Sequence, residues 1–125
     1  CAAPELVEVT AGFTTFVIYI DRKYRRGRGC AYRAILDHEN QHVAIYRETL
    51  KRYAPWIKKS LALEVRRFRP VTVGSQARAA DRVKKLLMRK LRPLVKKMET
   101  NAELANAEID TTSSYRAIQA KCRNW

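Results

Sequence analysis

The chain has 125 residues, the length of one domain with a single buried core, so we expect one domain over residues 1–125. Its ordinary apolar share argues against disorder, and no apolar run approaches the roughly 20 residues of a membrane-spanning helix. The charge is unusual: 26 Lys and Arg stand against 12 Asp and Glu, a formal net of +14. Such an excess favours anionic partners, whether nucleic acid, a phospholipid surface or an acidic polymer.

The first segments of the chain have the composition of β-strands. Residues 5–10 (ELVEVT) alternate polar with apolar side chains, and residues 14–24 (TTFVIYIDRKY) are rich in β-branched and aromatic ones. Gly12 breaks the pattern between them. We therefore expect two antiparallel strands here, followed by a basic loop over residues 25–29 (RRGRG).

The rest of the sequence has the three- and four-residue apolar spacing of helices. Pro55 ends or bends the first helix, and a kink is expected at Pro93 in the long one. The predicted fold class is α+β, with a small antiparallel β-hairpin packed on a mainly helical body. The expected helices span residues of about 30–53, 56–68, 76–109 and 113–122.

Residues 38–42 read His-Glu-Asn-Gln-His, inside the first helix. Positions i and i+4 of a helix lie nearly above one another, so His38 and His42 can present their imidazoles to one ion. Glu39 lies beside the pair, where its carboxylate can reach a metal-bound water without being a ligand. This is the arrangement of a zinc hydrolase, in which Zn²⁺ lowers the pKa of its water to about 7 and a glutamate accepts the proton.

The alternative is that HENQH is accidental, two histidines on the polar face of a basic helix. Two observations weigh against it. The chain has only two histidines, and both lie in the motif. The motif is also surrounded by apolar side chains, which indicates that its histidines face inward: Ile35, Leu36, Val43 and Ile45.

The segments 31–42 (AYRAILDHENQH) and 110–115 (DTTSSY) resemble the zincin metallopeptidases, and more narrowly the bacterial "predicted secreted zinc-dependent protease" family. The resemblance implies a zincin-like fold with an active-site helix beneath a small sheet. It also implies hydrolysis of a peptide or protein substrate outside the cytoplasm. In that family an aspartate is followed by threonine and then His-Gly, where this chain has Tyr115-Arg116.

Without a third histidine, the third metal ligand must be a carboxylate, a tyrosine or a cysteine. Asp110 is the first choice, because it ends the long helix where a turn can aim its side chain at another helix. Glu108 and Glu103 are the alternatives among the glutamates. Tyr115 is expected to donate a hydrogen bond to the oxyanion, as phenols do in some zincins, or else to pack on the last helix.

The cysteines favour an extracytoplasmic location, periplasmic or secreted. Cys30 lies about 12 Å along the helix from His38, and the segment from Asp110 to Cys122 covers a similar distance. A Cys30–Cys122 disulfide would therefore hold one end of both segments and leave Asp110 near the histidines; two free thiols are the alternative. The chain opens CAAPELVE, as processed bacterial lipoproteins do, so a lipid anchor on Cys1 is also considered.

The basic residues form a loop around Arg22–Arg28 and a row on one face of the long helix: Lys85, Arg89, Arg92 and Lys96. Such a row is often only a solvated face, but it can also attract an anionic envelope surface. Nucleic acid is the less favoured partner, because no recognisable binding module is present.

Three functions remain open. The first is a zinc-dependent metallopeptidase or hydrolase that uses His38, His42 and Asp110 as ligands, with Glu39 and Tyr115 as catalytic groups. The second is an inactive zincin-like domain that binds metal or a partner. The third is a basic helical protein that binds nucleic acid or a membrane surface.

Overall fold

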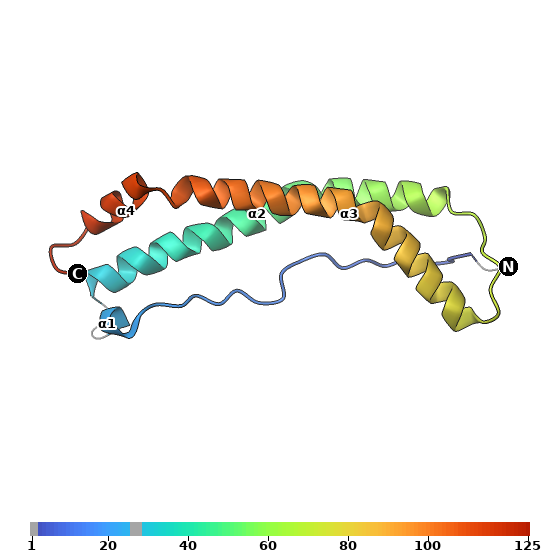
Figure 1. The fold of residues 1–125 in the computed structure, drawn as a ribbon, viewed down its shortest axis with the longest axis horizontal. Helices are drawn as coiled ribbons and strands as arrows, with labels where there is room; N and C mark the ends of the chain where they lie inside the picture. Colours follow the sequence, from blue (N-terminus) through green and yellow to red (C-terminus); the bar gives the residue numbers. More distant parts are fainter. Residues whose placement is uncertain (1–2, 26–28) are drawn as a thin grey trace. The chain divides into compact units, whose positions relative to one another are not determined.

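A computed structural model of the chain describes residues 3–25 and 29–125, and the elements in this part of the chain are helices (Figure 1). They are α1 (Arg22–Arg25), α2 (Cys30–Arg66), α3 (Gln76–Ile109) and α4 (Thr112–Gln119). No β-strand occurs within the described ranges. The predicted α+β class is therefore wrong, and the protein is helical. Cys1 and most of the basic loop, residues 26–28, lie outside the described residues.

The expected strands at 5–10 and 14–24 are extended or irregular chain, and the second ends in the short helix α1. They do not pair because they belong to different compact units: residues 1–12 pack with unit 1, and the chain from Phe13 packs with unit 2. The strand-like composition still has a consequence. Phe16, Ile18 and Ile20 are buried or half-buried, whereas Val17 and Tyr19 are 62% and 84% exposed. The segment alternates like a strand but packs on helices.

Helix α2 passes through Pro55 without interruption and joins the two segments that were expected at 30–53 and 56–68. A proline inside a helix removes one backbone hydrogen bond and usually breaks or kinks the helix. Here the residues on both sides of Pro55 are anchored, since Tyr53 is 1% exposed and Ile57 6%. Their burial within unit 1 offsets the lost hydrogen bond and keeps the helix continuous.

Unit 1 comprises residues 1–12 and Leu50–Glu99, that is, the second half of α2 and most of α3. Its core is built from Tyr53, Ile57, Ala79, Leu87 and Leu91, each less than a tenth exposed. Helix α3 covers the same range that its periodicity predicted, and it contains Pro93. Figure 1 shows α3 with a bend, the consequence expected of a proline in a helix interior.

Unit 2 comprises Phe13–Thr49 and Thr100–Trp125, and so holds the first half of α2, the end of α3 and all of α4. Its core mixes apolar and polar residues: Ile20, Ala34, His38, Thr49, Ala102 and Asn106 are all buried. The presence of buried polar side chains is unusual for so small a core and marks this unit as the one that carries a site.

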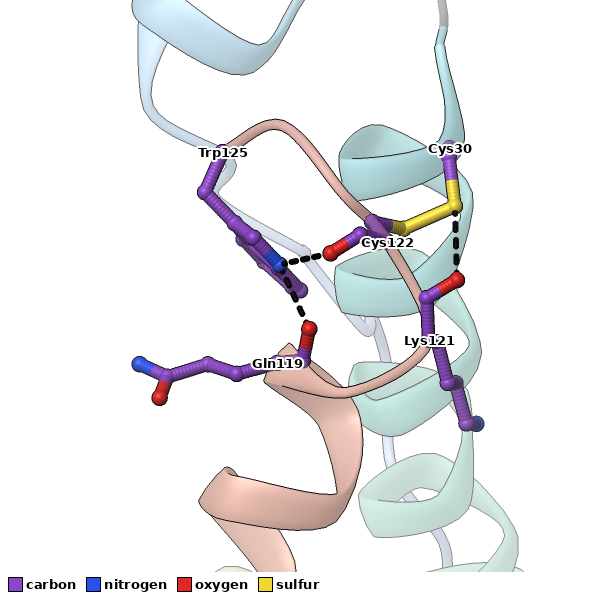
Figure 2. Close-up of a disulfide and its surroundings, with 5 residues drawn as sticks. All are labelled: Cys30, Gln119, Lys121, Cys122 and Trp125. Atoms are coloured by element: carbon purple, nitrogen blue, oxygen red, sulfur yellow. Dashed lines mark hydrogen bonds between the residues drawn. A yellow bond between two sulfur atoms is a disulfide. The ribbon is translucent and has the colours of Figure 1, made fainter.

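Two features hold the end of the chain in unit 2. Thr111 caps α4, because its hydroxyl accepts a hydrogen bond from the Ser114 backbone N–H at 3.1 Å. A disulfide joins Cys30, the first residue of α2, to Cys122 beyond α4, with their Cα atoms 5.8 Å apart (Figure 2).

No helix in the described part of the chain is both long and apolar enough to cross a membrane.

Candidate metal centre

His38 and His42 lie one turn apart on α2, and both rings face the interior of unit 2. The side chain of His38 is 7% exposed and that of His42 19%. Their Nε2 atoms are 3.3 Å apart, and the rings meet edge to face with centroids 4.8 Å apart. The helical spacing that the sequence indicated therefore does bring the two imidazole nitrogens to one point.

Asp110 comes directly after the last residue of α3, and its carboxylate meets both histidines. Its Oδ1 lies 3.1 Å from His38 Nε2 and 3.2 Å from His42 Nε2. These three side chains form a group that could hold a metal ion. Glu103 and Glu108, the alternative ligands, lie exposed on α3 and do not belong to this group.

Asn106 lies on α3, one turn before Asp110, and it fixes the orientation of the His42 ring. Its amide nitrogen donates to the Ala102 carbonyl at 2.7 Å, so its Oδ1 is turned toward His42 Nδ1, 2.6 Å away. Because an amide oxygen only accepts, His42 Nδ1 must carry the proton. The Nε2 atom of neutral His42 is then left with its lone pair directed at the cluster. This is the outer hydrogen bond that metal-binding histidines usually make.

With His42 protonated on Nδ1, the middle of the cluster is a region of negative electrostatic potential. His42 Nε2 and Asp110 Oδ1 both direct lone pairs into the cluster. A single proton on His38 Nε2 cannot form a full hydrogen bond to both of them at once. Two lone pairs 3.2 Å apart repel unless positive charge lies between them. A bound cation or an additional proton would remove that repulsion, so the arrangement is suited to a metal ion.

Tyr115, on α4, is the fourth side chain at the cluster. Its hydroxyl donates a hydrogen bond to Asp110 Oδ1 at 2.9 Å, and its ring lies 5.5 Å from the His38 ring, between centroids. The pKa of the Tyr115 phenol is raised, first by this hydrogen bond, then by burial and by the negative charges of Asp110 and Glu39. The phenol thus keeps its proton at neutral pH.

The carboxyl of Asp110 is ionised at neutral pH. Burial by itself raises its pKa, but the hydrogen bonds from Tyr115 and His38 and the charges of His42 and His38 outweigh that effect and lower the pKa below its ordinary value. Its side chain is 41% exposed, in contrast to the two histidines. The cluster is therefore closed on the α2 side and open to solvent on the Asp110 side.

Glu39 lies next to His38 on α2 and is half-buried. Its charge is the smallest of the contributions to the raised pKa of Tyr115. Glu39 is not one of the three groups that converge on a common point. Glu39 therefore neighbours a ligand along the chain without being one itself.

The Cys30–Cys122 disulfide and Trp125 secure the end of α4 to the start of α2 (Figure 2). The indole N–H of Trp125 donates to the Gln119 carbonyl at 2.7 Å and also approaches the Cys122 carbonyl at 3.2 Å. The Cys30 sulfur lies 3.3 Å from the Lys121 carbonyl oxygen, a contact only, since a disulfide sulfur has no hydrogen to donate. These contacts hold α4, and with it Tyr115, against the helix that carries the histidines.

The structure thus brings together His38, His42 and Asp110, with Tyr115 bonded to Asp110. Glu39 follows His38 on α2, and its expected contact with a metal-bound water stays a prediction. Sequence reasoning missed Asn106. The signal was present, because Asn106 continues the apolar row of α3 one turn after Ala102, and both are buried. A polar side chain on a buried helix face, four residues before an expected ligand, points to a residue that supports the site.

No family model matches the chain, and neither a search of curated proteins nor one of solved structures found a match. The functional argument therefore depends on the geometry of the cluster.

Proposed function

We propose that this protein is a zinc-dependent hydrolase, most simply a metallopeptidase, with His38, His42 and Asp110 as its metal ligands. The observation that carries the proposal is the triangle of His38 Nε2, His42 Nε2 and Asp110 Oδ1, whose edges are 3.1, 3.2 and 3.3 Å. Ligands about 2.0–2.1 Å from a tetrahedral Zn²⁺ lie roughly 3.3–3.4 Å from one another. The side chains need to move apart by only a few tenths of an ångström.

The donor set also supports zinc over the commoner hard cations. Ca²⁺ and Mg²⁺ prefer six or more oxygen ligands, whereas this group offers two imidazole nitrogens and one carboxylate oxygen. Structural zinc sites have four protein ligands, and catalytic ones have three with a position left for water. Three ligands and an exposed carboxylate favour the catalytic kind.

Bound zinc would supply a water with a pKa of about 7 and polarise the substrate carbonyl. The Glu39 carboxylate would take a proton from that water as its oxygen bonds to the peptide carbonyl carbon. Glu39 would then pass the proton to the nitrogen that leaves when the C–N bond breaks. Tyr115 keeps its phenolic proton and could donate it in a hydrogen bond to the developing oxyanion, after giving up its bond to Asp110.

The disulfide supports a location outside the cytoplasm. Disulfides persist in oxidising compartments such as the periplasm and are rare where thiols are kept reduced. The Cys30–Cys122 pair closes a loop of 92 residues, and it joins the two segments that carry the site. We propose accordingly that the protein acts in the periplasm or after secretion.

A metal-binding domain without turnover is the second candidate. In zincins an edge strand above the metal binds the extended substrate, and the described part of this chain contains no strand. Tyr115 is also engaged with Asp110, where it can serve to orient a ligand and need not act in catalysis. Both features fit a protein that holds metal for another purpose.

Substitution of Glu39 separates the two candidates. Glu39→Gln keeps the size of the side chain and leaves the three ligands intact, so zinc content measured by plasma mass spectrometry should stay at the parent level. Hydrolysis of a mixed peptide library should fall by about 10²–10⁴-fold, because the general base is lost. Glu108→Gln, an exposed glutamate of the same unit, is the matched control and should retain both metal and activity.

A parent that binds zinc but hydrolyses no peptide would leave only the second candidate. A parent purified without chelators that contains no zinc, and gains none by dialysis, would end both.

A further inference from the structure

The positive charge of this protein is concentrated away from the metal cluster. Unit 1 carries sixteen of the 26 Lys and Arg and only five of the 12 Asp and Glu, a net of +11. Unit 2, which holds the cluster, carries the remaining ten and seven, a net of +3. Whatever the metal site does, most of the attraction for an anionic partner comes from the other unit.

On α3 the charge forms a single row. Six cations follow one another at three- and four-residue spacing, which places them within one narrow face of the helix, opposite the face that Leu87 and Leu91 bury. All six are exposed. At 1.5 Å per residue the row is about 27 Å long. We call it the α3 stripe: Arg78, Arg82, Lys85, Arg89, Arg92 and Lys96.

The α3 stripe is largely free of neutralising partners. Lys85 is paired with Asp81 at 2.8 Å, and both side chains are well exposed. For the other five cations the described part of the chain contains no ion pair. Like charges spaced along one helix face repel one another, so the stripe costs folding stability and is best explained by a partner that neutralises it.

A second row, on the unit 1 half of α2, mixes cations with apolar side chains. Its members share one face of the helix by the same spacing and are all exposed. Trp56 is 50% exposed and Leu63 40%, although a solvated helix face usually carries polar side chains at such positions. We call it the α2 stripe: Arg52, Trp56, Lys59, Leu63 and Arg66.

We infer that unit 1 docks on an anionic phospholipid surface through the α3 stripe, and that the α2 stripe, with Trp56, is a second row suited to the same kind of surface. Lys and Arg near such a surface each contribute attraction to acidic headgroups, and Trp is favoured at the boundary between headgroups and acyl chains. Exposed Leu63 and Met88 can enter the same boundary region. Lipid headgroups also move laterally, so they can gather along a row of cations on a convex helix, even one that bends.

Nucleic acid fits these rows less well. Proteins that bind single strands combine a basic groove with several aromatic side chains on which the bases stack. In the described part of unit 1, Trp56 is the one exposed aromatic residue, since Tyr53 is buried and Phe68 half-buried. A convex row of cations offers no groove for a nucleic acid backbone.

The test uses the whole chain with vesicles of phosphatidylcholine alone and vesicles in which about a third of the lipid is phosphatidylglycerol. In co-flotation at low salt the parent should bind the anionic vesicles and leave the neutral ones. The stripe variant Arg82→Gln, Arg89→Gln, Arg92→Gln, Lys96→Gln should bind at least about a hundredfold more weakly, because roughly fivefold losses for four cations near the surface multiply.

The matched control removes four exposed cations from unit 2, Arg22→Gln, Arg33→Gln, Lys121→Gln and Arg123→Gln, and has the same net charge. It should bind within about threefold of the parent, since these cations are not on the stripes. The tryptophan emission of the parent should shift to the blue on anionic vesicles, and Trp56→Phe should remove that shift. Far-UV circular dichroism checks that each variant keeps its helix content.

Three outcomes would overturn the inference. One is the absence of binding to anionic vesicles. Another is an equal loss in the stripe variant and in the unit 2 control, which would show that only net charge matters. The third is tighter binding to a DNA or RNA oligonucleotide than to anionic vesicles at the same salt concentration. None of these results depends on metal, so the inference and the proposed function can fail separately.

Discussion

The Nδ1 atom of His42 lies 2.6 Å from the Oδ1 atom of Asn106, and this contact determines which nitrogen of the ring faces the cluster. Asn106 is itself oriented by the bond from its amide to the Ala102 carbonyl. The proton of His42 is thereby held on Nδ1, and the Nε2 lone pair is available to a cation. Asn106, which is not one of the three candidate ligands, thus orients His42 Nε2 toward the point where a metal ion could bind.

Substitution of Asn106 should weaken metal binding without removing a ligand. Asn106→Ala frees the His42 ring to rotate and to change tautomer, so we expect zinc affinity to fall by about 10–100-fold. Competition against a chromophoric chelator measures the change. Asn40→Ala removes an exposed amide from within the motif on α2, where it is not a ligand, and should leave the affinity as it is. An Asn106→Ala protein with parental affinity would contradict the role assigned to this hydrogen bond.

The three ligands should behave alike and differently from the neighbouring acids. His38→Ala, His42→Ala and Asp110→Asn should each lose most bound zinc, because two remaining ligands cannot make a tetrahedral site. Zinc should also raise the melting temperature of the parent by binding only the folded chain, and it should not do so in these variants. Differential scanning calorimetry with and without zinc tests this. Glu108→Gln should respond as the parent does, and zinc loss in that variant would mean that the wrong carboxylate has been chosen.

Tyr115 has two alternative roles that Tyr115→Phe distinguishes. The phenyl ring keeps the packing on His38 but loses the hydrogen bond to Asp110. If the hydroxyl mainly orients Asp110, zinc affinity should fall several-fold and turnover at saturating zinc should be unchanged. If it stabilises the oxyanion, zinc affinity should hold while kcat falls by about 10²-fold or more. We expect the second result, measured as kcat and Kd for zinc on the same preparation.

The disulfide should contribute a large share of the stability of unit 2. Closing a 92-residue loop is worth about 4–5 kcal/mol in the chain-entropy model, although measured values are often smaller. Cys30→Ser with Cys122→Ser should therefore lower the free energy of unfolding by about 2–5 kcal/mol, measured in urea. Zinc affinity should fall as well, since the segment that carries Asp110 is no longer tied to α2 through α4. A variant as stable as the parent would show that the helices alone hold this end of the chain.

Helix packing in unit 1 should depend most on Tyr53, whose side chain is 1% exposed. Tyr53→Ala leaves a cavity beside Ile57 and should cost about 3–5 kcal/mol, seen as a lower urea midpoint. Tyr53→Phe keeps the ring and should cost much less. If the two variants were equally stable, burial of the Tyr53 ring would not be the interaction that keeps α2 continuous through Pro55.

The sequence by itself determined the parts of the site that depend on helical spacing. His38 and His42 are one turn apart in any α-helix, so their convergence followed from the pattern alone. The same is true of the α3 periodicity, which predicted the range of that helix. Lengths along the chain also favoured Cys122 as the partner of Cys30, because a helix has a constant rise, and the structure confirms the pair.

Only the tertiary structure decided whether residues 5–10 and 14–24 form a sheet. Strand composition in residues 5–10 and 14–24 describes side chains that suit an extended backbone, but a strand also needs a partner for its N–H and C=O groups. That partner is set by packing at a distance, and here the two segments pack on different units. The sequence made Asp110 the first choice as third ligand over Glu108 and Glu103, but only the tertiary structure shows which carboxylate reaches the histidines. The loop after α3 brings the Asp110 carboxylate to the histidines, and the two glutamates remain in solvent.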